Sequence, residues 1–197
     1  ASNLFQETLD VFDALGDLSP SSETDSQPHT STGLIGGVNL IFDSGSYDLS
    51  NYGFGSYLIA ASESISLSGN LSFASSQNVE ELMFISSGPF KISDGASVDF
   101  SGNSLGFGSF DTIEIMNVGL FAGGEIGIRS LDSIIIKDSE FATRGSGADL
   151  IHLIAAADLS IDNLRFSEQV RQITMEAMTI NLSNLNFPAG STVNLNS

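Results

Sequence analysis

The chain has 197 residues, of which 41% are hydrophobic, and its 24 acidic and 6 basic residues give a formal net charge of −18. This charge argues against nucleic acid and anionic membranes as partners, because both attract clustered Lys and Arg. The chain contains no Cys, which excludes disulfides and thiolate metal sites. Its longest apolar runs, such as 150–157, are far too short to cross a bilayer, so no membrane insertion is predicted.

Residues 1–33 are predicted to form an N-terminal amphipathic segment and a linker. Asn3 and Gln6 have the spacing of a capping box that starts a helix, and Gly16 can end it. The apolar face of this helix, at 3–15, contains Leu4, Phe5, Thr8, Leu9, Val11, Phe12 and Leu15. Such a short helix is marginal alone in water and must dock on another surface. Residues 17–33, rich in Ser, Thr, Asp and Pro, lack periodicity and indicate a linker.

From residue 34 onward the chain repeats one motif. Two apolar residues alternate with other residues, Asn or Asp follows, and a Phe comes three or more residues later. The motif begins at residues 47, 65, 90, 113, 134, 159 and 180, which corresponds to a repeat of roughly 22 residues. Because the same unit recurs in the same direction, it predicts coils stacked in parallel rather than hairpins.

Each repeat also carries a second apolar pair ahead of the motif, as in Leu82 and Phe84 or Ile126 and Ile128. This alternation indicates two or three short strands per coil, separated by Gly, Ser, Asn or Asp turns. Crossovers between parallel strands are almost always right-handed. Residues 34–197 are therefore predicted to form an all-β, right-handed parallel β-helix, a β-solenoid of about seven coils.

Stacking of the coils predicts two columns of like residues. An internal aromatic column is expected from Phe73, Phe100, Phe121, Phe141, Phe166 and Phe187. A second column at a turn is expected from Asn51, Asp94, Asn117, Asp138, Asn163 and Asn184. The amides in this second column can donate to a carbonyl or carboxylate of an adjacent coil and so form a ladder. The alternative explanation is that Asn and Asp simply suit turns.

In this repeated pattern of short strands and polar turns, residues 34–197 resemble secreted bacterial right-handed parallel β-helix proteins of the filamentous-haemagglutinin and autotransporter-passenger type. The resemblance is strongest in the closing stretch 175–195, which is rich in Asn, Ser and Leu. It implies a secreted protein at the cell surface or outside the cell, and a structural role in a surface fibre or adhesin stalk. It implies no catalytic, cofactor-binding or metal-binding residue.

The competing hypothesis is a polysaccharide-acting β-helix enzyme, a lyase or hydrolase, with its site on an outer strand face. Asp111, Asp132 and Glu176 each precede the first Ile of a coil motif at two or four residues, so they can line one face. Arg129 and Arg144 are the nearby basic residues. Convergence of three carboxylates and an Arg in one groove would favour the enzyme, and a uniformly solvated exterior would favour the fibre.

No other motif predicts chemistry. The Gly-Gly-x-Gly-x-Asp repeat of calcium-binding β-rolls and the EF-hand pattern are both absent. The two histidines are His29, in the expected linker, and His152, expected to be a satisfied residue at the edge of the core. No catalytic residue, cofactor or metal site is predicted, and the chain is expected not to be an enzyme.

The expected partner is a second copy of the chain. Alternation continues through 193–197 with no capping helix, which predicts an open last coil. The amphipathic segment 3–15 can pack on that coil in a neighbouring copy, and such a contact would propagate head to tail as a homopolymer. Two alternatives are that 3–15 caps its own first coil and that the chain is trimmed from a longer passenger.

Overall fold

The computed structural model describes residues 32–49, 55–74, 79–145 and 149–197, and all regular structure in these ranges is β-strand. The strands are β1 (Thr32–Phe42), β2 (Gly45–Asp48), β3 (Ser56–Ala74), β4 (Glu81–Ser86), β5 (Phe90–Phe100), β6 (Ser104–Ser109), β7 (Ile113–Met116), β8 (Gly119–Ala122), β9 (Glu125–Ser130), β10 (Ile134–Thr143), β11 (Leu150–Ala155), β12 (Asp158–Phe166), β13 (Gln172–Glu176), β14 (Thr179–Ser183) and β15 (Thr192–Asn196). Every strand pairing among them is parallel.

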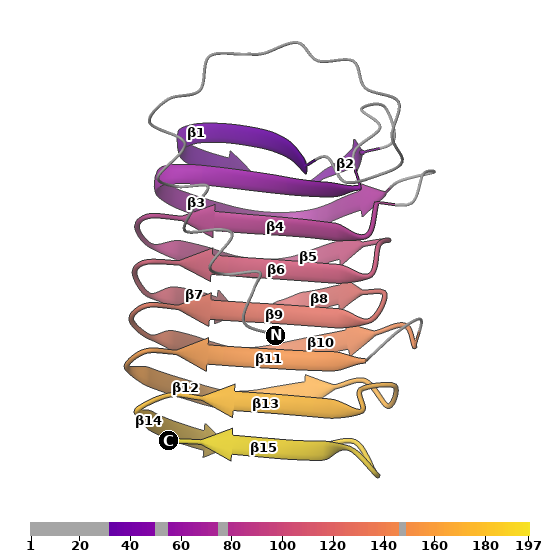
Figure 1. Ribbon diagram of the computed structural model, residues 1–197, viewed down its shortest axis with the longest axis vertical. Helices are drawn as coiled ribbons and strands as arrows, with labels where there is room; N and C mark the ends of the chain where they lie inside the picture. Colours follow the sequence, from indigo (N-terminus) through magenta and orange to yellow (C-terminus); the bar gives the residue numbers. More distant parts are fainter. Residues whose placement is uncertain (1–31, 50–54, 75–78, 146–148) are drawn as a thin grey trace.

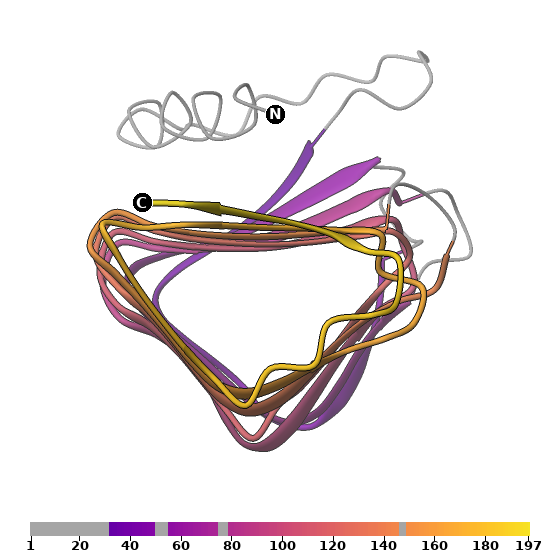
Figure 2. The ribbon, with the colours of Figure 1, turned by 90° about the horizontal axis from the view of Figure 1, so that it is seen from below.

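The strands form a stack of coils with a triangular cross-section (Figures 1 and 2). The first face consists of β4, β6, β9, β11, β13 and β15, together with the starts of β1 and β3. The second face contains β7 and β14 with the leading parts of β5, β10 and β12. The third face contains β2 and β8 with the trailing parts of β3, β5, β10 and β12.

The first face shows the number and hand of the coils. Its eight successive strand segments pair in parallel, which closes seven coils. A coil takes between 25 residues, at 56–81, and 20 residues, at 172–192. In Figure 2, seen from the C-terminal end, the chain turns counterclockwise as it advances toward the viewer, so the solenoid is right-handed. The predicted fold class is confirmed.

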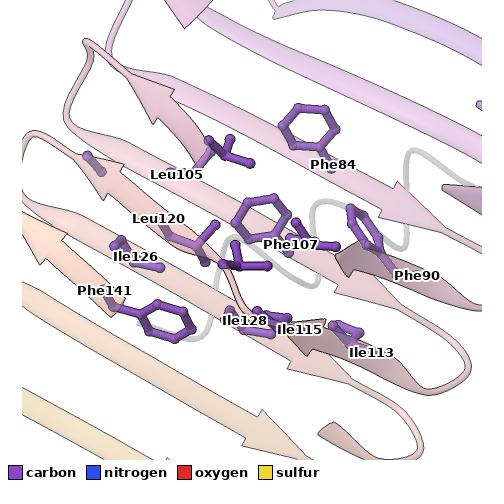
Figure 3. Packing of buried hydrophobic residues seen from close by; sticks show 14 of the residues in the cluster. Phe84, Phe90, Leu105, Phe107, Ile113, Ile115, Leu120, Ile126, Ile128 and Phe141 are labelled. Carbon is purple, nitrogen blue, oxygen red and sulfur yellow. The ribbon is translucent and has the colours of Figure 1, made fainter. Parts of the chain in front are cut away.

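Alternation along each strand places one side chain inside the coil and the next outside. Stacking then lines up the inward residues in continuous rows, such as Leu40, Ile65, Phe90, Ile113, Ile134, Leu159 and Ile180. Within the first face Phe84 stacks on Phe107 at 5.6 Å, and in the centre Phe90 from the second face meets Phe107 edge-on (Figure 3). Ring pairs of this geometry contribute about 0.5–1.5 kcal/mol beyond area burial.

The predicted aromatic column is only partly right. Phe73 and Phe100 share one inward row, and Phe141, Phe166 and Phe187 share the neighbouring row of the same face. Phe121 is the error: β8 buries Leu120 and Ala122, and Phe121 stacks between Asp99 and Ala142 on the outer side. The reason is spacing. Phe141 follows its corner residue Asp138 by three positions and Phe121 follows Asn117 by four, and a shift of one residue reverses the face.

The predicted column of Asn and Asp marks the corner between the second and third faces. Its residues have positive φ, from 49° to 56°, at Asn117, Asp138, Asn163 and Asn184. The same corner is formed by Gly69 and Gly95 in earlier coils. The corner requires a residue in the left-handed backbone conformation, which Gly, Asn and Asp tolerate best. The ladder also exists, since Asn163 Nδ2 donates to Asp138 Oδ1 at 2.7 Å.

Two predictions concern parts of the chain that the structure does not describe. The amphipathic segment 3–15 and most of the linker 17–33 lie outside the described residues, as does Asn51. Strand β1 begins at Thr32, so the solenoid occupies the predicted range from residue 34 onward. The division of the chain at residue 33 stays a prediction.

Candidate functional site

Polar side chains gather at the corner between the first and second faces, and the innermost of them form a buried serine ladder. Ser86, Ser109 and Ser130 end β4, β6 and β9 in register and are almost fully buried. The Ser109 hydroxyl donates to Gly88 O at 2.7 Å and accepts from Asp111 N at 3.0 Å. Ser130 repeats this pattern with the Asp111 carbonyl and the Asp132 amide. The serines therefore satisfy corner backbone groups that parallel strand pairing leaves unpaired.

Outside this ladder lie Asp111 and Asp132, two of the three carboxylates that the competing enzyme hypothesis would need, at equivalent positions in successive coils. Thr112 connects them, because its backbone amide donates to Asp111 Oδ1 at 2.6 Å and its hydroxyl donates to Asp132 Oδ2 at 2.9 Å. The third, Glu176, ends β13 on the first face and pairs in register with Ile154 and Asn196. The described structure thus brings two of the three carboxylates together.

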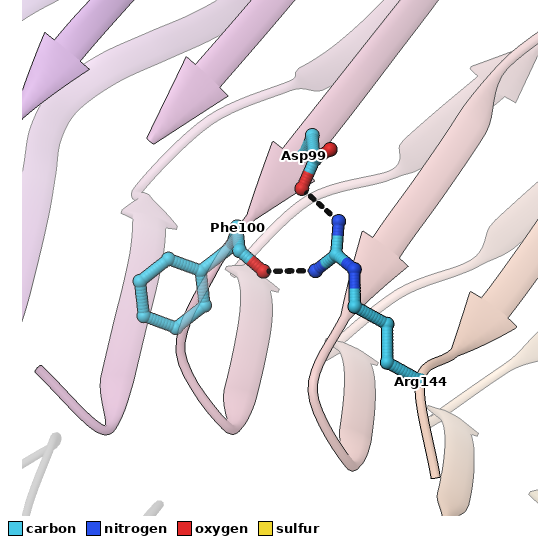
Figure 4. Close-up of polar contacts among 3 residues, drawn as sticks. All are labelled: Asp99, Phe100 and Arg144. Carbon is cyan, nitrogen blue, oxygen red and sulfur yellow. Dashed lines mark hydrogen bonds and ion pairs between the residues drawn. The ribbon is translucent and has the colours of Figure 1, made fainter. Parts of the chain in front are cut away.

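The two candidate arginines lie apart. Arg144 follows β10 at the corner between the third and first faces, where it forms an ion pair with Asp99 and donates to the Phe100 carbonyl (Figure 4). Arg144 therefore connects its own coil with the coil that lies two turns earlier in the chain. Both partners of the ion pair are close to half exposed, so the contact contributes at most about 1 kcal/mol. Arg129 lies on the outer side of the first face, between Gly108 and Ile154.

The histidines do not complete a catalytic set in the described structure. His152 lies on the outer side of β11 and is half-buried, while Ile151 and Leu153 face the core. The expectation of a residue at the edge of the core was therefore wrong, because alternation turns this position outward. His29 lies outside the described residues.

The corner between the second and third faces holds Asp162, a carboxylate whose hydrogen bonds lower its pKa. Asp162 Oδ1 accepts from the Ser183 hydroxyl at 2.7 Å and from Asn184 Nδ2 at 2.8 Å. These two hydrogen bonds, with a smaller contribution from the charge of Lys137, lower the pKa of Asp162 against the opposing effect of desolvation. These side chains connect the last two coils by hydrogen bonds, which is a structural role.

Carboxylates at both corners accept hydrogen bonds from neighbouring coils, as Asp132 does from the Thr112 hydroxyl and Asp138 from the Asn163 amide. Within the described ranges, no group of three or more His, Asp or Glu side chains is placed to hold a metal ion. Sequence reasoning missed the serine ladder. Its signal is a Ser that ends an apolar strand two residues before Gly or Asp, as in Ser109-Phe110-Asp111.

Comparisons with known proteins do not assign the chain to a family. No protein-family model matches it, and searches of curated proteins and of solved structures found no significant match. Among the residues that the structure describes, no helix has the length and hydropathy needed to cross a membrane.

Proposed function

We propose that the chain is an extracellular structural module, a subunit or segment of a surface fibre or adhesin stalk. The observation that carries this proposal is the continuity of the inward rows. They run through all seven coils, and they are still partly exposed in the first coil, at Ile35 and Phe42, and in the last, at Val193 and Leu195. Apolar rows of this kind are completed when a further coil stacks on them.

Stacking of one copy on another extends the rows without a change of register. Strand β15 occupies the same face as the start of β1, so Leu195 of one copy would meet Ile35 of the next. By the same register Ile180 would meet Leu40, on the second face. Edge strands with unpaired backbone groups are natural templates for such addition. The contact is heterologous, so it does not close and propagates as a filament.

The composition supports a role outside the cell. The acidic, Cys-free exterior keeps separate filaments apart through like charge. The resemblance to passenger-type β-helices, whose repeats form extended stalks, points the same way.

Electron microscopy and light scattering on the purified chain test the proposal. Wild type is expected to form unbranched filaments one solenoid wide as concentration rises. Leu195→Asp should remain monomeric, because it places a charge where two coils would meet. Leu131→Asp, which changes an exposed apolar residue on a central corner, should still polymerise. A monodisperse wild-type monomer at high concentration would contradict head-to-tail assembly.

A further inference from the structure

The outer side of the first face carries an apolar patch, which we define as Leu58, Ala60, Met83 and Ile85. Register places these residues outside: Leu58 pairs with Met83, and Ala60 pairs with Ile85. Their neighbours Tyr57, Ile59, Leu82 and Phe84 point inward and belong to the main core. The patch forms a separate hydrophobic cluster, on the opposite side of the same sheet.

The patch is buried although it faces away from the core. Leu58, Ala60 and Ile85 are 7%, 5% and 3% exposed. Neighbouring side chains do not account for this, since Ile85 is flanked by Ala60 and by Gly108, which has no side chain. Ile154 occupies the same outer row between the larger Arg129 and Glu176, and it is more exposed than Ile85. A layer above the sheet is therefore required to cover Ile85.

The local sequence agrees with burial on both sides. Residues 57–61 and 82–85 are uninterrupted apolar runs, which are typical of strands covered on both faces. Below the patch, Met83 and Ile85 lie against Gly106 and Gly108, where an added Cβ would meet their side chains at 3.2 and 3.5 Å. The absence of side chains on these glycines leaves room for a packed element.

No described strand supplies that layer, because strand contacts in the described ranges join neighbours in the coil wall or at a corner. Residues 1–31 precede β1, which enters the solenoid on this same face. A helix at 3–15 would be about 20 Å long. The remaining residues up to 31 reach as far as roughly 50 Å when extended, and the patch is only one to two coils, roughly 5–10 Å, from β1.

We propose that residues 3–15 dock in cis on this patch, with their apolar face over Leu58, Met83 and Ile85. Docking in cis leaves the contact between copies to the end coils. The inference goes beyond the proposed fibre role, since it fixes where the N-terminal segment binds whether or not copies associate.

Cysteine pairs test the proposal, because the natural chain has none. Leu9→Cys with Met83→Cys should form an intramolecular disulfide in the monomer, at a rate independent of protein concentration. The matched control combines Leu9→Cys with Glu114→Cys, on the outer side of the second face. Since docking raises the effective concentration at the patch only, the first pair should oxidise at least about tenfold faster than the control.

Two outcomes would overturn the inference. Equal rates for the two pairs would show that the segment does not select the patch, and disulfide-linked oligomers in place of a linked monomer would show that it binds another copy. Deletion of residues 1–16 supplies an independent measurement. It should expose the patch and increase binding of an apolar dye, and Ile85→Ser in the deleted chain should reduce that increase. Both measurements are made on the monomer, so they do not depend on filament formation.

Discussion

The central coils and the last coil contain the same inward rows but bury them to very different extents. Phe141 is fully buried between Leu120 and Phe166, whereas Phe187, in the same row, is 36% exposed. Met175 is fully buried, and Leu195, its partner in the next strand, is 54% exposed. The difference shows that a position in the repeat does not by itself fix how much a residue stabilises the fold. A coil on each side is needed.

The largest expected effect compares the two phenylalanines. Phe141→Ala should lower the free energy of unfolding by about 3–5 kcal/mol, because it leaves a cavity between residues fixed by their coils. Phe187→Ala should cost less than about 2 kcal/mol, since part of its ring already meets solvent and the last coil can relax. Chemical denaturation of both variants measures the difference, and equal losses would show that the last coil is covered in solution.

The next effect concerns the serine ladder of the central coils. Ser109→Ala removes the donor to Gly88 O and the acceptor for Asp111 N, both at a buried corner. We expect a loss of about 1–3 kcal/mol, the usual cost of a buried unsatisfied group. The matched control is Ser160→Ala, on the outer side of β12, which should change stability by less than about 0.5 kcal/mol. A similar loss for both serines would mean that the buried hydroxyl has no special role.

Substitutions at the corner residue Asn163 can distinguish the effect of its left-handed backbone conformation from the effect of its hydrogen bond. Asn163→Gly removes the bond to Asp138 and tolerates positive φ, whereas Asn163→Ala also forces a Cβ into that region. The alanine variant should be less stable than the glycine variant by about 1 kcal/mol. The same pair at Asn184, in the last coil, should show a smaller difference, because a freer corner can change its φ. Identical stabilities of Ala and Gly at position 163 would contradict the conformational explanation.

The sequence predicted the solenoid well because alternation and repeat length are determined by the inward rows, and these rows dominate the apolar pattern. It failed where one residue of spacing matters. Phe121 lies one position farther from its corner residue than Phe141 does, and parity sends it outward. Gly95 lies at a shift of register in β5, so the corner there is a glycine next to the predicted Asp94.

The candidate site could be predicted less well, for a different reason. Asp111 and Asp132 are equivalent in the repeat, so their proximity follows from the period. Arg144 and Asp99 are not equivalent, and their ion pair depends on how far one long side chain reaches across a coil. The buried outer patch was not predicted because an alternating pattern assigns only every second residue to the core. The apolar residues at the outward positions of 57–61 and 82–85 indicate that both sides of the sheet are covered there.

The smallest expected effect tests whether the last two coils are joined electrostatically. Asp162 is half-buried, and its pKa is lowered first by the Ser183 hydroxyl, then by the Asn184 amide. A lowered folded-state pKa means that the ionised form is favoured by folding. Its contribution is present above the unfolded-state pKa, near 3.9, and is lost as the pH falls through the lower folded-state value. The hydrogen bonds between Asp162 of β12 and the end of β14 should therefore weaken only in acid.

Amide hydrogen exchange of Ser183 and Asn184, followed from neutral pH down into the acid range, measures this coupling. In wild type, protection of these two amides should fall as Asp162 becomes protonated, while protection in the central coils stays unchanged. Asp162→Asn keeps an acceptor oxygen but cannot titrate, so the step should disappear in that variant. A carboxyl titration of Asp162 at or above the ordinary range would sink the explanation, because the hydrogen bonds of the last coil would then favour the neutral acid.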